Sequence, residues 1–199
     1  HGIVLTASYP AKRMGVKTGM PIWEAKQHCR DLIIVPASYG KYQKYSGYVR
    51  EVFNDYTDQV ESFGLDEAWL DITGSVGLFG SPVKIAKEIS VRIKRELGIT
   101  VSIGVSFNKI TAKLGSDYKK PDAITVIEPD NYKQIVYPLP VGDLLYVGNA
   151  TQRKLGSYGI RTIGQLAETN PETLKGWFGV MGYTLSAFAR GLDQTPVAK

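Results

Sequence analysis

Apolar residues recur at intervals of three and four in two stretches of the chain, which is the spacing of helices with one buried face. The first stretch starts at Tyr42, and its apolar positions are Tyr45, Val49, Val52, Phe53 and Tyr56. The second lies between Ser81-Pro82 and Gly98, and its apolar positions are Ile85, Ile89, Ile93 and Leu97. Serine before the first turn, proline within it and glycine after the last turn are typical helix ends. The pattern therefore predicts two long helices.

Strand-forming residues dominate three further segments, at 60–72, 100–105 and 123–127. Because these segments alternate with the predicted helices, we expect a layered sheet with helices packed on one face. An apolar run at 32–35 predicts a buried strand that ends at Pro36, since proline cannot donate to a sheet ladder. Before that run, one helical turn is expected at 9–15 and a short helix from Pro21 toward His28.

After Pro138 and Pro140, the pattern changes to short helices broken by glycines, at Gly148, Gly159, Gly179 and Gly182. No strand is predicted there, so we place a boundary near residue 128. The predicted fold class is α+β. It combines a small α/β part at 1–36, a mixed β-sheet with packed helices at 37–127, and an all-α part at 128–199.

The net charge of +5 suits a polyanionic partner such as nucleic acid, and residues 1–36 hold five basic but two acidic side chains. A single cysteine, Cys29, excludes an internal disulfide framework and a four-cysteine zinc site, and it favours a cytoplasmic location. The longest apolar run is too short to span a bilayer, so no membrane partner is expected. The sequence opens at His1 inside an apolar run that reads as the second half of a strand, and we expect a truncated N-terminus.

Adjacent carboxylates, Asp66 and Glu67, interrupt the apolar segment 65–71. Two acids buried within a strand are costly unless a cation or a hydrogen-bond partner compensates their charge. A divalent cation such as Mg²⁺ would do so, because it prefers hard oxygen ligands. The alternative is that both acids lie at a strand end, facing solvent or a lysine. The residues by themselves leave both interpretations open.

A strand-to-helix segment at 104–109 continues into a helix that ends in a basic loop at 117–121. Lysine acts as a point charge on phosphate, so such a loop near a carboxylate site suits a triphosphate. Solvated lysines at a helix end are the alternative. Near the N-terminus, Tyr9 and Lys12 share one face of the predicted turn, where a phenol and an ammonium suit phosphate oxygens. Ordinary surface packing explains that pair equally well.

Segment 144–151 lies between two short predicted helices and resembles a helix-hairpin-helix. The backbone N–H groups of such a hairpin bind a DNA phosphate without reading sequence. Tyr146 replaces the first of the two glycines that the hairpin normally has, and Gly148 is the second. Lys154 follows in the next predicted helix. Taken alone, the segment is equally well explained as a structural turn.

The order of these motifs resembles that of the Y-family DNA polymerases, the DinB and UmuC-like enzymes, over essentially the whole chain. In that family, a Tyr-x-x-basic turn is followed by Ser-x-Asp-Glu-x-x-x-Asp, Gly-[Ile/Val]-Ser-x-Asn-Lys-x-x-Ala-Lys, Asp-x-x-Lys-Pro and a helix-hairpin-helix thumb. The corresponding segments here are 9–12, 64–71, 104–113, 117–121 and 144–151. The resemblance implies addition of deoxynucleotides to a primer 3′-OH by two-metal phosphoryl transfer, in the bypass of damaged DNA.

The resemblance assigns a role to each matching residue. The catalytic carboxylates that bind two Mg²⁺ ions are Asp66 and Glu67. The contacts to the incoming triphosphate are Thr6, Tyr9, Lys12 and Lys120. The contacts to DNA are Gly148 and Lys154. Two positions depart from the family pattern, because Lys12 stands where arginine is common and Gly64 stands where serine is usual.

By the same resemblance, residues 1–36 are part of the fingers, 37–127 the palm without its first strand, and 128–199 the thumb. The absent first strand carries a further metal-binding aspartate and the little finger is absent too, so we expect this fragment alone to be inactive. The implied partners are primer-template DNA, the incoming deoxynucleotide, and a sliding clamp reached through absent C-terminal residues. Two alternatives are a non-catalytic DNA-binding or scaffold protein and a nucleotidyl cyclase, and the helix-hairpin-helix segment argues against the cyclase.

Overall fold

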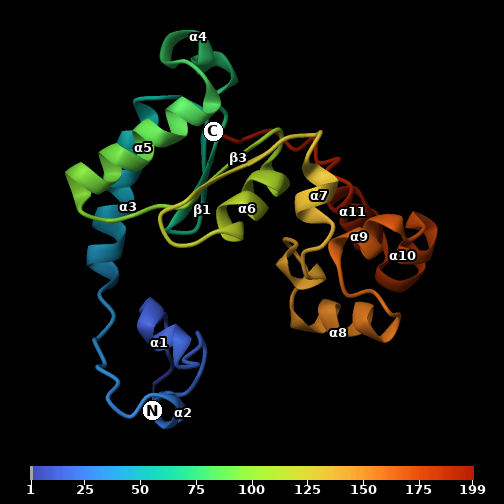
Figure 1. Ribbon diagram of the computed structural model, residues 1–199, viewed down its shortest axis with the longest axis horizontal. Coiled ribbons are helices and arrows are strands. Elements are labelled where there is room, and N and C mark those ends of the chain that lie inside the picture. Colours follow the sequence, from blue (N-terminus) through green and yellow to red (C-terminus); the bar gives the residue numbers. More distant parts are fainter. Residues whose placement is uncertain (1) are drawn as a thin grey trace. The chain divides into compact units, whose positions relative to one another are not determined.

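The computed structural model describes residues 2–199, which divide into two compact units at 2–43 and 44–199 (Figure 1). The first unit contains two short helices, α1 (Tyr9–Arg13) and α2 (Ile22–His28), and both were predicted. Ser8 Oγ accepts a hydrogen bond from the backbone N–H of Ala11 at 3.4 Å and thereby caps α1. The buried side chains of this unit are Val4, Ala11, Val16 and Ala25.

The predicted strand at 32–35 is wrong. The segment forms no ladder with another described segment, and the pairing recorded within residues 2–43 is a single bridge between Ile3 and Pro21. Ile33 is 86% exposed and Val35 is 78% exposed, whereas Leu32 packs against the small core of the unit. The Leu32 N–H donates to the Cys29 carbonyl at 3.2 Å, and the other backbone N–H groups of this segment have no partner among residues 2–199 and rely on solvent.

The long helix α3 (Tyr39–Asn54) begins in the first unit and continues into the second. Its buried apolar side chains lie in the second half, because Tyr42 and Tyr45 are exposed while Val52 is buried. Helix α5 (Pro82–Leu97) has the predicted ends, since Ser81 Oγ accepts from Lys84 N at 3.3 Å and Gly98 has a φ of +68°. Both helices contribute to one core, whose fully buried members are Val52, Tyr56, Ile85, Ile89 and Ile93.

Strands β1 (Val60–Phe63) and β2 (Glu67–Leu70) form an antiparallel hairpin in which Glu61 lies opposite Trp69. Successive side chains of a strand point to opposite faces. On one face, Leu70 packs against the core of α3 and α5. On the other, Trp69 Nε1 donates to the backbone carbonyl of Lys109 at 2.9 Å. A 3₁₀ turn (Thr73–Ser75) and helix α4 (Val76–Phe79) then lead to α5.

Strands β3 (Ile103–Ser106) and β4 (Ile124–Ile127) are parallel, and helix α6 (Lys109–Tyr118) makes the crossover that a parallel pair requires. The helix lies very close to β3. A Cβ added at Gly104 would stand 1.9 Å from the backbone oxygen of Ala112. Glycine at this position therefore sets how closely α6 approaches the strand.

The rest of the second unit is helical apart from a single bridge between Pro140 and Thr162. Its elements are α7 (Tyr132–Val136), a 3₁₀ turn (Val141–Asp143), α8 (Asn149–Ser157), α9 (Ile163–Glu168), α10 (Pro171–Phe178) and α11 (Val180–Ala189). Their core is continuous with Ile110 and Leu114 of α6 and Ile127 of β4. The α+β class is confirmed. Within residues 2–199, every helix is too short or too polar to cross a membrane.

Candidate active site

Asp66 and Glu67 lie at the tip of the β1–β2 hairpin, where Asp66 is an exposed turn residue and Glu67 is the half-buried first residue of β2. Of the two interpretations that the sequence left open, the acids at a strand end match the structure, and the acids buried within a strand do not. Gly64 has a φ of +75°, and the chain reverses just before the two acids. Both carboxylates therefore stand at a strand end, and Glu67 faces a lysine, as the alternative interpretation had it.

The lysine is Lys113 of α6, whose ammonium lies 2.8 Å from Glu67 Oε1 and 2.9 Å from Asp117 Oδ2. Burial lowers the pKa of Lys113, but hydrogen bonds to the two carboxylates outweigh burial and raise that pKa above its ordinary value. Asn108 begins this helix, because its Oδ1 accepts from Thr111 N at 2.9 Å. The cap and the ion pair together fix α6 against the hairpin tip.

Asp117, at the end of α6, also binds Lys120, and its Oδ1 lies 2.7 Å from that ammonium. Burial raises the pKa of Asp117, but hydrogen bonds from Lys120 and then Lys113 outweigh it and hold the pKa below its ordinary value. A single carboxylate therefore holds two lysines. The structure thus links Lys120, which the resemblance places on a triphosphate, to Glu67 through two intermediate side chains.

Sequence reasoning gave no role to Lys109 or Lys113, although both are in the motifs it singled out. Lys109 lies 2.6 Å from Glu61, and Lys113 pairs with Glu67, so two lysines four residues apart reach two acids of the same hairpin face. The signal in the sequence was the spacing of four between the two lysines, combined with one acid in each of two neighbouring strands, Glu61 in β1 and Glu67 in β2. Their pairing was still not predictable, because it depends on how the hairpin packs on α6.

A bound divalent cation needs several oxygen ligands around it. Asp66 and Glu67 supply carboxylate oxygens, which are the donors that Mg²⁺ prefers, so the chemical kind of ligand fits. Within the described part of the chain, however, no three His, Cys, Asp or Glu side chains come together to hold a metal ion. The hairpin tip therefore offers two ligands of the right kind and needs at least one more from elsewhere.

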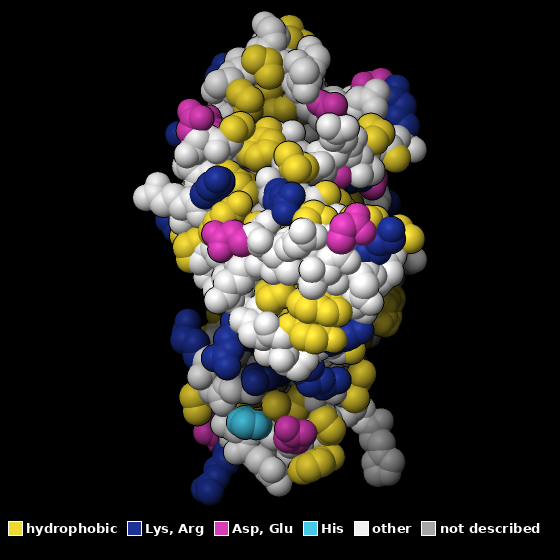
Figure 2. Space-filling view, turned by 90° about the vertical axis from the view of Figure 1, so that its right-hand side faces the viewer, with side chains coloured by type: hydrophobic (Ala, Val, Ile, Leu, Met, Phe, Trp, Pro, Cys, Tyr) yellow, Lys and Arg dark blue, Asp and Glu magenta, His cyan; other side chains and the backbone are white. Residues whose placement is uncertain are grey.

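The remaining triphosphate candidates lie in the first unit. The ammonium of Lys12 stands 5.3 Å from the centre of the Tyr9 ring, so these two side chains share a face of α1 as expected. Thr6 is exposed in the extended segment before α1. Figure 2 shows several Lys and Arg side chains close together at the lower end of the view, over the N-terminal part of the chain. This unit thus combines an exposed phenol with a basic surface.

The hairpin between the 3₁₀ turn and α8 keeps the backbone form of a glycine at Tyr146, whose φ is +70°. The backbone N–H groups of Tyr146, Gly148 and Asn149 have no hydrogen-bond partner among residues 2–199. Lys154 points elsewhere, because its ammonium donates to the carbonyl of Trp177 at 2.5 Å and stands 4.8 Å from the Phe178 ring. One of its three N–H donors is therefore already used within the chain.

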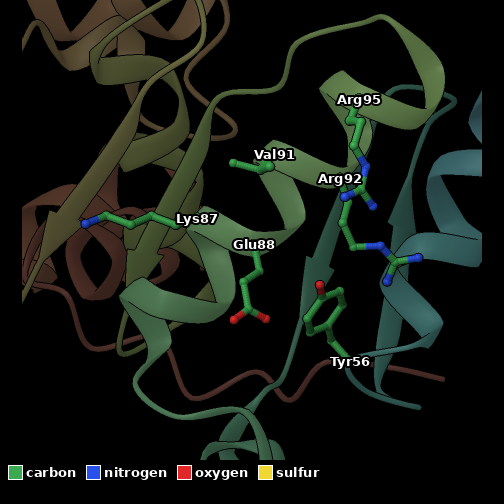
Figure 3. Close-up of a pocket in the computed structure, with 6 residues that line it drawn as sticks. All are labelled: Tyr56, Lys87, Glu88, Val91, Arg92 and Arg95. Carbon is green, nitrogen blue, oxygen red and sulfur yellow. The ribbon is translucent and has the colours of Figure 1, made fainter.

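Two surface pockets of about 420 Å³ each lie outside the hairpin tip. The first is on α5 and is lined by Tyr56, Lys87, Glu88, Val91, Arg92 and Arg95. In it, Arg92 extends toward the Tyr56 ring while Lys87 points away (Figure 3), and Arg92 pairs with Asp55 at 2.8 Å. The second lies beside Asp117 and includes Asp143, whose pKa is raised by burial and by the charge of Asp117. Neither pocket contains Asp66 or Glu67.

The comparisons with known proteins cover the whole chain. The sequence profile described as the impB/mucB/samB family matches residues 1–117, and the one described as the thumb domain of DNA polymerase-iota matches residues 142–193. The chain is 55% identical over 199 residues to DNA polymerase IV of Acetivibrio thermocellus, covering all of this chain and 50% of that protein. It is 41% identical over 196 residues to DNA polymerase IV 1 of Bacillus subtilis, covering 98% and 47%.

Solved structures agree with the sequence matches. DinB from Sulfolobus solfataricus has a TM-score of 0.88 at 32% identity, covering 98% of this chain and 58% of that one. An insertion ternary complex of Dbh DNA polymerase has the same score and identity, covering 98% and 57%. The chain spans about half the length of the curated relatives it matches. The chain belongs to the impB/mucB/samB family, which confirms the resemblance to Y-family polymerases that its motifs indicated.

Proposed function

We propose that the full-length protein containing this chain is a translesion DNA polymerase, which adds deoxynucleotides to a primer 3′-OH on damaged templates. The observation that carries the proposal is the hairpin tip, where Asp66 and Glu67 stand together and Lys113 and Asp117 connect Glu67 with Lys120. Acids for a divalent cation and a lysine for a triphosphate are then parts of one connected group. Relatives at 55% and 41% identity that are named DNA polymerase IV support the same activity.

In this proposal, residues 1–36 act as part of the fingers, 37–127 as the palm and 128–199 as the thumb. Thr6, Tyr9, Lys12 and Lys120 would orient and neutralise the triphosphate of the incoming deoxynucleotide. The free N–H groups around Gly148, together with Lys154, would hold a phosphate of the primer-template duplex. We propose a cytoplasmic location, and a sliding clamp as a further partner that is bound through parts of the protein outside this chain.

Asp66 and Glu67 would hold two Mg²⁺ ions together with a further ligand from outside this chain. When bound, these ions supply Lewis acidity toward the primer hydroxyl and neutralise charge on the triphosphate. The task of the chain itself is positioning. Gly64 turns the hairpin so that both acids come to its tip, and Lys113 fixes one oxygen of Glu67 while the other stays open.

Primer extension by the full-length protein tests this function. Asp66→Ala should abolish extension while DNA affinity changes by less than about threefold, because the acid acts on the metal and not on the duplex. Asp58→Ala is the control, since Asp58 is an exposed acid just before β1, lies outside the 64–71 motif and pairs with Lys199. Extension by Asp66→Ala at near the wild-type rate would contradict the assigned site.

A further inference from the structure

Four side chains beside the hairpin tip alternate in charge along one line of contacts, and we call them the charge chain: Glu67, Lys113, Asp117 and Lys120. The successive nitrogen–oxygen distances are 2.8, 2.9 and 2.7 Å. The first member is a candidate metal ligand, and the last is a candidate triphosphate ligand. The two in the middle have no role in the function proposed above beyond holding their neighbours.

Lys113 is the most enclosed member, with a side chain that is 18% exposed. An ammonium in that position cannot rely on water, so it must keep at least one carboxylate partner. Lys113 has two such partners, Glu67 and Asp117. If Asp117 binds Lys113 more strongly, Glu67 is freer to bind a cation, and the reverse also holds.

Asp117 divides its two oxygens between two lysines. Its Oδ2 accepts from Lys113, and its Oδ1 lies 2.7 Å from the ammonium of Lys120. Lys120 is the more exposed of the two, at 44% against 18%, so its ion pair is the weaker and more easily exchanged one. A triphosphate carries more negative charge than a single carboxylate and would attract Lys120 away from Asp117.

We propose that Lys113 and Asp117 are positioning residues that couple binding of the triphosphate to binding of a divalent cation at Glu67. When Lys120 moves from Asp117 to the triphosphate, Asp117 has one lysine instead of two and holds Lys113 more strongly. Lys113 then shares its charge less with Glu67, whose oxygens become better donors to a cation. This inference rests on the proposed function, because it takes Lys120 as a nucleotide ligand and Glu67 as a metal ligand.

The test measures Mn²⁺ binding to the full-length protein without nucleotide, through the electron paramagnetic resonance signal of free Mn²⁺. Lys120→Ala imitates the departure of Lys120 from Asp117, and we expect it to tighten Mn²⁺ binding by about two- to tenfold. Lys119→Ala is the matched control, because it removes the same charge from the same loop and Lys119 has no ion pair in the described structure. We expect a smaller change in this control.

A double-mutant cycle separates the charge chain from simple long-range electrostatics. In an Asp117→Asn background, Lys120→Ala should no longer affect Mn²⁺ binding, since the connecting carboxylate is gone. A second cycle with Lys113→Met should be equally non-additive, and it serves if the first background folds poorly. Equal effects of Lys120→Ala in all backgrounds, or equal effects of Lys119→Ala and Lys120→Ala, would overturn the coupling.

One further variant distinguishes failure of this coupling from failure of the proposed function. Asp66→Ala should weaken Mn²⁺ binding at least about tenfold, because it removes a ligand of the same site. If that loss occurs while the two cycles are additive, the coupling is wrong and the metal site stands. If Mn²⁺ binding is unchanged in Asp66→Ala, the metal site itself is wrong and the coupling falls with it.

Discussion

The ammonium of Lys109 lies 2.6 Å from each carboxylate oxygen of Glu61 and 4.6 Å from the centre of the Trp69 ring. This pair joins the first residue of α6 to strand β1. One turn later, Lys113 reaches Glu67 on the neighbouring strand. Two ion pairs thus hold the hairpin and the helix together, so the position of Glu67 depends on Glu61 as well.

Stability at acid pH should reveal the Glu61 pair. The pKa of the Glu61 carboxyl is lowered, chiefly by the hydrogen bond from Lys109 and next by the hydrogen bond from the backbone N–H of Ala198. A carboxyl with a depressed folded-state pKa stabilises the fold above its unfolded pKa of 4.5, and this contribution is lost as pH falls through the folded value. Glu61→Gln should therefore flatten the dependence of the unfolding free energy on pH below about 4.5.

Urea unfolding between about pH 3 and pH 7 measures this effect. The control is Glu88→Gln, because Glu88 stands 3.7 Å from Lys84 on the exposed face of α5 and should contribute little. At pH 7, Glu61→Gln should cost about 2 kcal/mol, the value typical of hydrogen bonds to charged groups. Identical pH profiles for Glu61→Gln and the wild type would refute the assignment.

Gly104 sets the approach of α6 to β3, and we expect Gly104→Ala to destabilise the second unit by roughly 2 kcal/mol or more. The reason is steric, since the added Cβ would stand 1.9 Å from the Ala112 oxygen. The opposite result is expected at Gly156 in α8, where nothing lies within 4 Å of an added Cβ. Gly156→Ala should stabilise the protein by about 0.5–1 kcal/mol. Thermal unfolding of both variants decides, and a neutral Gly104→Ala would contradict the close packing.

Restoring the usual family residue at position 64 should not help this chain. Gly64 has a φ of +75°, and its carbonyl accepts from Arg50 Nη2 at 3.1 Å. Gly64→Ser should cost about 1–2 kcal/mol, because a side chain disfavours the left-handed region. Gly74→Ser is the control, with no atom within 4 Å and no positive φ. Equal stability of the two variants would mean that the hairpin turn can adopt another conformation in solution.

Elements whose signals are local were predicted well from the sequence. Helix α5 combines an N-cap, a proline, an apolar stripe and a terminal glycine, and it begins and ends where these residues place it. The run at 32–35 has apolar residues but no local signal that supplies a pairing partner, and it is extended and mostly exposed. Hydrophobicity indicates that a segment would benefit from burial, but the partner that buries it comes from elsewhere in the fold.

The candidate site shows the same division. The identities of Asp66, Glu67 and Lys120 followed from motif order, but their surroundings did not. The charge chain links residues of β2, α6 and the loop after it, and its geometry depends on tertiary packing. The turn at Gly64 was visible in the sequence as a glycine before two acids, and it would have placed them at a strand end.

The last prediction concerns Lys154, which uses one N–H donor on the Trp177 carbonyl and keeps two for another acceptor. In the full-length protein, Lys154→Ala should weaken DNA binding uniformly across sequences. The slope of log affinity against log salt should fall by about 0.9, the contribution of one neutralised phosphate.

The control for that measurement is Lys84→Ala. Lys84 lies on α5 and not on α8, and it pairs with Glu88 of the same helix, so its loss should leave the salt slope unchanged. Lys154→Ala also removes a hydrogen bond at the end of α10, so some loss of thermal stability is expected in either case. The salt slope is therefore the informative quantity. A lower melting temperature with an unchanged slope would show that Lys154 supports α10 alone, and the phosphate contact would then have to come from the backbone N–H groups near Gly148.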